Sequence, residues 1–226
     1  MTLCHYRKGE SMPRVSEKYY DEKKNKIMDT TLELIREVPL YQLTMSDVIK
    51  KLGCSQGMIY RYYQGIDEIY VCLMNREIRD IEFRSKIDDI IESQRTHREI
   101  LSSLFSELGK YLLLVMDRVG GKMLYELQVR YAFDKEKQEI WLPKLLFKQN
   151  FMYFQKVCVE YLLAGVEKGI YRTKIPVKDL VLYVGVSIDG ILNYVALTEN
   201  ENREIVKEET FVLLQTLSNY VYQNIE

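Results

Sequence analysis

Hydrophobic positions near the start of the chain follow the 3.6-residue period of an α-helix. The first such set is Ile27, Leu32, Leu34, Ile35 and Val38. Residues spaced in this way form one stripe that can be buried against a neighbouring element. Because proline cannot continue a helix, the pattern predicts a first helix that begins near Asp21 and ends before Pro39.

A second and a third helix are predicted on either side of a very short link. Thr44 can cap the second helix, with Asp47 three residues later, and Gly53 stands where that helix would end. Ser55 can cap the third helix, which is expected over residues 56–63. The three residues between the two helices allow only a sharp turn, which is typical of a helix-turn-helix.

The remaining pattern is also helical. Gly65 opens a fourth helix whose apolar positions continue to Ile91, so one long connecting helix is expected there. Five further helices are predicted over residues 97–118, 121–133, 143–168, 177–199 and 202–223. The fold class is therefore all-α. Residues 1–17 are polar and aperiodic, and we expect them to form a flexible arm ahead of one domain at residues 18–66 and a second at residues 67–226.

The composition is that of a folded protein with almost no net charge. Hydrophobic residues make up 47% of the 226 positions, which is enough for a substantial core. The net charge is −1, so the molecule is not the uniformly basic body that indiscriminate nucleic-acid binding favours. Residues 1–65 carry 11 Lys and Arg against 8 Asp and Glu, which puts a small positive excess at one end.

Residue spacing gives little support for a metal site, a redox site or an enzyme. The cysteines and histidines show no metal-ligand or redox spacing; they are Cys4, Cys54, Cys72, Cys158, His5 and His97. The segment from Gly185 to Gly190 resembles the turn around a catalytic serine only superficially, because its second glycine falls one residue late and no strand precedes it. We expect close helix packing there, with no catalytic residue, metal or cofactor. The polar first residues lack the apolar run of a secretion signal, which predicts a cytoplasmic protein.

The third predicted helix has one apolar and one polar face. Ile59 and Tyr63 lie one turn apart and are expected to face a small core. The opposite stripe consists of Gln56, Gly57, Tyr60, Arg61 and Gln64. A DNA major groove admits one helix, and reading it requires hydrogen-bonding side chains for base edges and donors for phosphates at the rim. The stripe supplies both.

Each of these residues suits a particular contact with DNA. Gln56 can form two hydrogen bonds to adenine, and Arg61 can bond guanine or a phosphate. Gly57 leaves room where helix and bases approach most closely. The hydroxyls of Tyr60 and Ser55 suit phosphate oxygens, which fix the register without carrying sequence information. The sequence therefore predicts a DNA-reading helix.

One segment resembles the signature of the TetR family of transcription regulators: residues 40–63, with the sequence LYQLTMSDVIKKLGCSQGMIYRYY. The resemblance covers roughly residues 20–75. It implies that DNA is contacted from the third helix and from Ser46 on the second. The candidate DNA-binding residues are Thr44, Ser46, Ser55, Gln56, Gly57, Tyr60, Arg61 and Tyr62. Family members often carry a basic residue for a phosphate at the start of the fourth helix, whereas Ile66 stands there in this chain.

The resemblance also implies an α-helical ligand-binding and dimerisation domain in the rest of the chain. Residues 180–197 are apolar except for Ser187, Asp189 and Asn193, and residues 149–168 are similarly poor in polar faces. A central Asp costs ~2.5–3.5 kcal/mol in a membrane span, so we expect a buried helix of a soluble assembly. A second subunit could cover these two helices in a homodimer, which would place two recognition helices about 34–36 Å apart, or a multiple of that.

A cluster of Met and aromatic residues in the middle of the chain suggests a pocket for a small apolar or aromatic effector. The candidate ligand-binding residues are Met116, Met123, Tyr125, Trp141, Phe151 and Phe154. At helical spacing, such residues also serve as ordinary core side chains, and that alternative stays open for each of them.

The sequence as a whole predicts a dimeric repressor that binds a palindromic DNA operator and is released by a small-molecule ligand. The alternative is a TetR-like protein that acts through a protein partner instead of a small-molecule effector. The two differ in salt dependence, because phosphate contacts weaken steeply with salt and contacts to an apolar protein patch do not.

Overall fold

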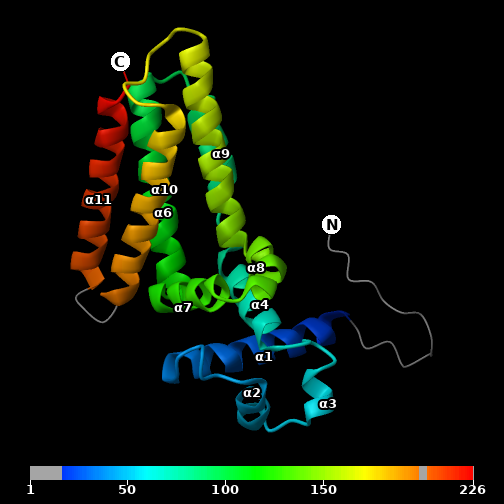
Figure 1. The fold of residues 1–226 in the computed structure, drawn as a ribbon. Helices are drawn as coiled ribbons and strands as arrows, with labels where there is room; N and C mark the ends of the chain where they lie inside the picture. Colours follow the sequence, from blue (N-terminus) through cyan, green and yellow to red (C-terminus); the bar gives the residue numbers. More distant parts are fainter. Residues whose placement is uncertain (1–16, 199–202, 226) are drawn as a thin grey trace.

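The computed structural model describes residues 17–198 and 203–225, and these residues form eleven α-helices and one short 3-10 helix (Figure 1). The predicted all-α class is confirmed. Strand-like pairing within the described part is limited to one isolated bridge, between Thr173 and Ile225. The predicted arm lies outside the described residues except for Glu17, which begins the first helix.

The first three helices form a small unit at the lower end of the molecule (Figure 1). They are α1 (Glu17–Glu37), α2 (Met45–Leu52) and α3 (Gln56–Ile59). Their apolar residues meet in one core, with Ile27, Val48 and Ile59 almost fully buried. The periodic pattern therefore identified the inward faces correctly.

The third helix is shorter than predicted: it ends at Ile59 and not near Tyr63. The Arg61 N–H donates to the Met58 carbonyl and the Tyr62 N–H to the Ile59 carbonyl, so the chain tightens into turns. This tightening accompanies the burial of Tyr63, whose hydroxyl donates to the Lys24 carbonyl of α1 at 3.4 Å. Burial also raises the pKa of that hydroxyl, so it stays protonated.

The predicted long connecting helix is in fact two helices, α4 (Ile66–Ile78) and α5 (Phe83–Ile91). The break contains neither proline nor glycine, and its cause is tertiary. Arg118 of α6 donates to the Glu77 carbonyl at 2.9 Å and pairs with Asp80, which satisfies polar groups at the end of α4. The turn brings Phe83 into the core, where its ring stacks on Tyr111 at 4.1 Å between centroids.

The next helices are α6 (His97–Val119), α7 (Gly121–Ala132) and α8 (Lys135–Trp141), followed by the 3-10 turn η1 (Leu142–Lys144) and α9 (Leu146–Glu167). The helix α8 was not predicted, because its residues are mostly charged and leave no apolar stripe. Asp134 caps it by accepting from the Lys137 N–H at 3.0 Å. The ninth helix begins later than predicted, where Asn75 of α4 accepts from the Leu146 N–H at 2.8 Å.

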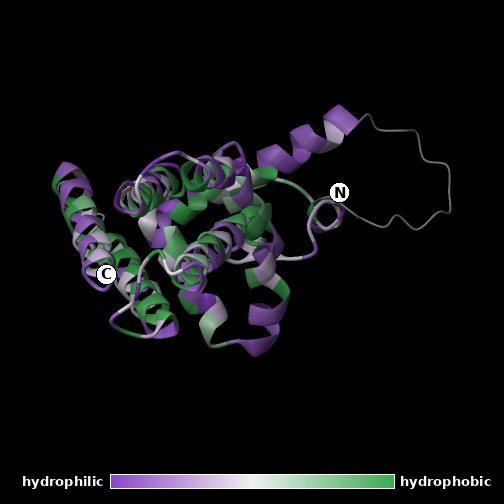
Figure 2. Cartoon of the chain, turned by 90° about the horizontal axis from the view of Figure 1, so that it is seen from above, coloured by the Kyte–Doolittle hydropathy of each residue, from purple (hydrophilic) through white to green (hydrophobic). Residues whose placement is uncertain are grey.

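The last two helices, α10 (Val177–Leu197) and α11 (Arg203–Gln223), complete a tall bundle above α1–α3. In this bundle α11 lies along α6, and α10 packs against α7, α9 and α11. Seen from above, the hydrophilic α1 extends beyond the upper helices (Figure 2). Burial raises the pKa of Tyr111, in the bundle core, to about 12, although its hydroxyl accepts a hydrogen bond from Asn150 at 3.0 Å.

One helix of the described part, α10, is long and apolar enough to cross a membrane by length and composition alone, a test that core helices of soluble proteins also pass. The sequence predicts that it is buried on all sides in an assembly. Within the single chain, Leu180, Ile188 and Val195 are buried, whereas Leu182 and Val186 remain exposed. Only one face of α10 is therefore covered by its own protomer.

Gly165 of α9 lies directly beneath the ring of Tyr171. A Cβ at this glycine would come within 2.1 Å of the Tyr171 Cζ atom. The ring cannot easily move away, because it is buried and its hydroxyl donates to the carbonyls of Tyr161 and Leu162 at 3.1 and 3.2 Å. The glycine thus allows a loop residue to satisfy carbonyl groups of the helix.

We predict that Gly165→Ala lowers the free energy of unfolding by about 1–3 kcal/mol, because the added methyl group overpacks this contact. The measurement is urea unfolding at one fixed protein concentration. The control is Gly185→Ala in α10, where the nearest atom to the new methyl is the flexible Gln155 amide at 3.2 Å. That variant should be neutral or stabilised by up to about 1 kcal/mol through helix propensity. Equal stability of the two variants would contradict the packing described here.

Candidate nucleic-acid interface

The second helix begins with a complete capping box at Thr44. Its hydroxyl oxygen accepts from the Asp47 N–H at 3.3 Å, and the Asp47 carboxylate accepts from the Thr44 N–H at 2.9 Å and from the Thr44 hydroxyl at 2.6 Å. These hydrogen bonds hold the pKa of Asp47 below its usual value. The predicted cap is confirmed, and it fixes where the helix-turn-helix starts.

The turn after α2 follows from Gly53. This residue has φ 63° and ψ 34°, in the left-handed region that favours glycine, and its N–H donates to the Lys50 carbonyl. Ser55 then occupies the N-cap position of α3, but its side chain makes no capping hydrogen bond, contrary to the sequence-based expectation. Its exposed hydroxyl is thus available to another partner.

The outer side of α3 is polar, as predicted. Gln56, Gly57, Tyr60 and Arg61 are exposed, while Ile59 on the opposite side has no exposed surface. Gln64, just beyond the helix, is also exposed. The structure therefore brings together donors, acceptors and one aromatic hydroxyl on a surface that is anchored from behind by a small core.

Gly57 has no internal structural role that explains a glycine. A Cβ built at this position would meet nothing within 4 Å. Its φ lies outside the left-handed region, and alanine has the higher helix propensity. The space above Gly57 is therefore open to a molecule that approaches α3 from outside.

Ser46 and Tyr62 differ in accessibility. Ser46 is exposed in the first turn of α2. Tyr62 is half-buried, and its ring packs against that of Tyr20 from α1, with 5.0 Å between centroids. Any contact from Tyr62 to DNA would therefore use only part of its ring or its hydroxyl.

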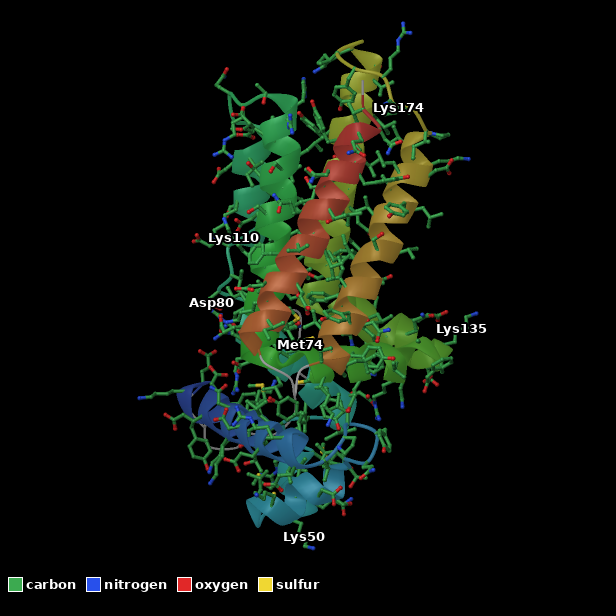
Figure 3. The ribbon with its side chains drawn as sticks, turned by 90° about the vertical axis from the view of Figure 1, so that its left-hand side faces the viewer. Lys50, Met74, Asp80, Lys110, Lys135 and Lys174 are labelled. Carbon is green, nitrogen blue, oxygen red and sulfur yellow. The ribbon has the colours of Figure 1, made fainter. Side chains whose placement is uncertain are left out.

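Two lysines of this unit, Lys50 and Lys24, are not among the residues predicted from the sequence. Lys50, at the C-terminal end of α2, lies at the lower tip of the molecule (Figure 3). It is exposed and makes no ion pair with any described residue, whereas its neighbour Lys51 pairs with Glu37 at 3.4 Å. Lys24 of α1 lies over the Tyr63 ring, 5.1 Å from its centroid. The Lys-Lys pair on α2 was visible in the sequence, but the proximity of Lys24 depends on the packing of α1.

The start of α4 is turned toward the protein interior. Ile66 is half-buried against the core, and the neighbouring Gln64 N–H donates to the Glu68 carboxylate at 2.7 Å. Asp67 pairs with Arg130 of α7 at 2.6 Å. The position where a basic residue was expected from the family pattern thus serves packing in this chain.

The helix-turn-helix unit is tied to the bundle next to α2. The Leu40 N–H donates to the Glu126 carboxylate of α7 at 2.5 Å. On the other side of the same segment, the buried Tyr70 hydroxyl of α4 donates to the carbonyls of Leu40 and Leu43 at 3.2 and 3.4 Å. A shift of α7 would therefore act directly on the segment that precedes α2.

The six candidate ligand-binding residues do not form one group. Met116 and Met123 line one hollow together, and Met116 and Tyr125 line a neighbouring one. Phe154 lies in the bundle core between the rings of Phe83 and Phe105, and Phe151 is buried on the same helix. Trp141 lies at the end of α8, under the Lys144 ammonium group. Their roles stay a prediction.

No group of three or more His, Cys, Asp or Glu within residues 17–198 and 203–225 is arranged to hold a metal ion. The cysteine thiol of Cys158 has a pKa raised by burial to about 12. This thiol is therefore protonated at neutral pH.

Comparison with known proteins agrees with the geometry. The family of bacterial regulatory proteins named tetR matches residues 27–71, which span the C-terminal half of α1, all of α2 and α3 and the start of α4. The HTH-type transcriptional regulator YfiR of Bacillus subtilis is 21% identical over 193 residues, covering 85% of this chain and 89% of that protein.

Two solved structures share the fold. A TetR transcription regulator from Haloarcula marismortui has a TM-score of 0.63 and 19% identity, with 91% of this chain and 100% of that chain covered. The transcriptional regulator FadR from Bacillus subtilis, in complex with stearoyl-CoA, has a TM-score of 0.58 and 18% identity, with 86% and 97% covered. The family is one of transcription regulators and not of enzymes. The chain is thus a TetR-family helix-turn-helix transcriptional regulator, with its DNA-binding domain at the amino-terminal end.

Proposed function

We propose that this regulator is a cytoplasmic homodimer that represses transcription from a palindromic operator and is released from DNA by a small molecule. The observation that carries the DNA-binding part is the exposed polar side of α3 around Gly57, fixed by the buried Ile59. In this proposal Gln56 and Arg61 contact base edges. Phosphates are held by Ser46, Ser55, Tyr60 and Tyr62, and also by Lys50. Thr44 lies beside them at the DNA surface and fixes the start of α2, since its N–H and hydroxyl both donate to Asp47.

The exposed apolar face of α10 supports the homodimer. Leu182 and Val186 lie one turn apart and are 67% and 63% exposed. On the adjoining helix, α11, Val212 is 60% exposed. The two helices pack against each other, and Tyr194 of α10 bonds Glu209 of α11. We propose that α10 and α11, in place of the α9–α10 pair expected from the sequence, meet their copies across a two-fold axis.

Release by an effector requires different ligand affinities in the DNA-bound and free conformations. The hydrogen bond between Leu40 and Glu126 supports such coupling, because it links α7 to the segment before α2. FadR of Bacillus subtilis binds stearoyl-CoA, so an acyl-CoA is one reasonable candidate to test. Of the six Met and aromatic candidates, Met116 and Met123 are proposed as residues near the effector, because they line one hollow together. The other four, Tyr125, Trp141, Phe151 and Phe154, do not line it.

A second function keeps the fold and replaces the effector with a protein partner. The half-buried Ile66, where family members often carry a basic residue, favours this alternative because it removes one phosphate contact. The salt dependence of binding distinguishes the effector-controlled repressor from the protein-partner alternative. If DNA is the main partner, log K falls linearly with log salt, with a slope of about −0.9 per phosphate contacted.

The test of the proposed function is selection of bound duplexes from a random DNA pool by the purified full-length protein, at physiological salt. We expect an enriched palindrome with half-sites one helical turn apart, or a multiple of that. Absence of enrichment from a folded dimer would refute sequence-specific DNA binding and favour the protein partner.

Two substitutions on α3 should separate base reading from backbone contact. We predict that Gln56→Ala reduces discrimination at one base pair of each half-site by ~1–3 kcal/mol. Tyr60→Phe removes one hydroxyl and should weaken all sequences alike, because phosphates carry no sequence information. Titrations of the selected operator and its single-base variants measure both effects. A uniform loss from Gln56→Ala would contradict its assignment.

The dimer surface can be tested by a matched pair of charge insertions. Val186→Glu should convert the dimer into monomers, since it places two carboxylates near the two-fold axis in a desolvated interface. Met152→Glu on α9, where the side chain is 57% exposed, should leave the dimer intact. Sedimentation equilibrium measures both variants. Dissociation by Met152→Glu alone would show that α9 forms the interface instead.

A further inference from the structure

A hollow of about 450 Å³ lies between the helix-turn-helix unit and the bundle. One wall is the C-terminal half of α1, with Leu32, Ile35 and Arg36. The other wall is formed by the end of α6 and the start of α7, including Met116 and Met123. Its size falls within the range of about 300–1,000 Å³ typical of small-molecule sites.

The hollow combines an apolar floor with a charged rim. Met116, Val119 and Met123 are at most 8% exposed and present thioether and methyl groups to it. Methionine side chains adapt to ligands of different shape. Such a floor suits an aliphatic or aromatic body more than a sugar or a nucleotide base.

The rim has three cations, Arg36, Arg118 and Lys122, and two anions. Arg118 is engaged by Asp80 and by the Glu77 carbonyl. Lys122 lies 3.9 Å from Glu126.

Arg36 is different from the other two cations. It is exposed, and it makes no hydrogen bond or ion pair with any residue of the described part. Both anions at the rim have partners, because Glu126 accepts from the Leu40 N–H and Asp117 lies 3.9 Å from Lys207. The charge left to attract a ligand is therefore positive and belongs to Arg36.

We propose that this hollow is the effector site and that the effector is a small amphipathic carboxylate. Its apolar body lies on the methionine floor, and its carboxylate pairs with Arg36, whose guanidinium can form two parallel hydrogen bonds with such a group. The proposal rests on the effector-controlled function given above, and it adds the place and chemical class of the ligand.

The location explains how binding would affect DNA. The two walls belong to different units, which are joined through α4 and through the Leu40–Glu126 hydrogen bond. Any change in the angle of α1 against α6 and α7 changes the width of the hollow. A ligand that bridges the walls therefore has different affinities for the two arrangements, which is the requirement for allosteric control.

The experiment uses the full-length protein with ¹³C-methyl methionine, which gives nine methyl signals. The Met116 and Met123 signals are assigned with Met→Leu variants, and octanoate is titrated in. Octylammonium, with the same chain and the opposite charge, is the ligand control. We expect saturable shifts of both signals with octanoate and none with octylammonium. Equal binding of both compounds, or no shift at either methionine, would overturn the proposal.

Two charge reversals on α1 form the protein control. Arg36→Glu should weaken octanoate binding about five- to ten-fold, Arg36→Lys should retain most of it, and Lys26→Glu, the same charge change on an exposed position of α1, should leave it unchanged. Equal dissociation constants for wild type and Arg36→Glu would exclude the assigned contact.

The titration is then repeated with the operator found by duplex selection. Octanoate affinity should fall several-fold when DNA is bound, since the coupling is reciprocal. An unchanged affinity would overturn the effector role. If no operator can be selected, the proposed function fails, whereas the titrations without DNA still decide whether the hollow binds a carboxylate.

Discussion

The ion pair between Asp67 and Arg130 is the contact on which the arrangement of the two halves depends. Its side chains are only 14% and 19% exposed, so neither charge could lose its partner without a substantial desolvation cost. The pair fixes the first turn of α4 against α7. With α7 held there, Glu126 reaches the Leu40 N–H, and with α4 held there, the Tyr70 hydroxyl reaches the carbonyls of the same segment. The helix-turn-helix unit is thus held in position by two polar contacts to the segment before α2, one from Glu126 of α7 and one from Tyr70 of α4.

Local sequence signals were sufficient for α2, but not for the end of α3 or for the cap expected at Ser55. The start and end of α2 depend on contacts within a few residues, such as the Thr44 cap and the left-handed Gly53, and both were readable from the sequence. The apolar spacing also gave the inward side of α3. Where an element depends on distant residues, the pattern failed: at the break after Ile78, the end of α4 is contacted by Arg118 of α6.

The functional surfaces divide in the same way. The polar stripe of α3 could be predicted because a helix has a fixed geometry and one side is anchored by Ile59. The ligand candidates could not be grouped, since helical spacing states which residues face inward but not which helix they meet. Phe154 and Met116 are both buried, yet Phe154 lies among the aromatic rings of the bundle core, whereas Met116 borders the hollow between the helix-turn-helix unit and the bundle. The role of Arg36 was not predicted, because it follows only from the tertiary structure, in which Arg36 borders the hollow and makes no ion pair with any described residue.

Gly57 has a consequence for how this chain can change over time. Folding alone places no demand on that position, because there is empty space where a side chain would extend. Alanine would favour the helix, so a population selected only for stability and expression would be expected to replace the glycine. In the proposed function, the glycine meets a requirement that operates only when the protein is in contact with DNA. A library of this regulator that is screened only for stability would therefore accumulate folded variants that no longer bind DNA. Their melting temperatures would not reveal this loss of binding.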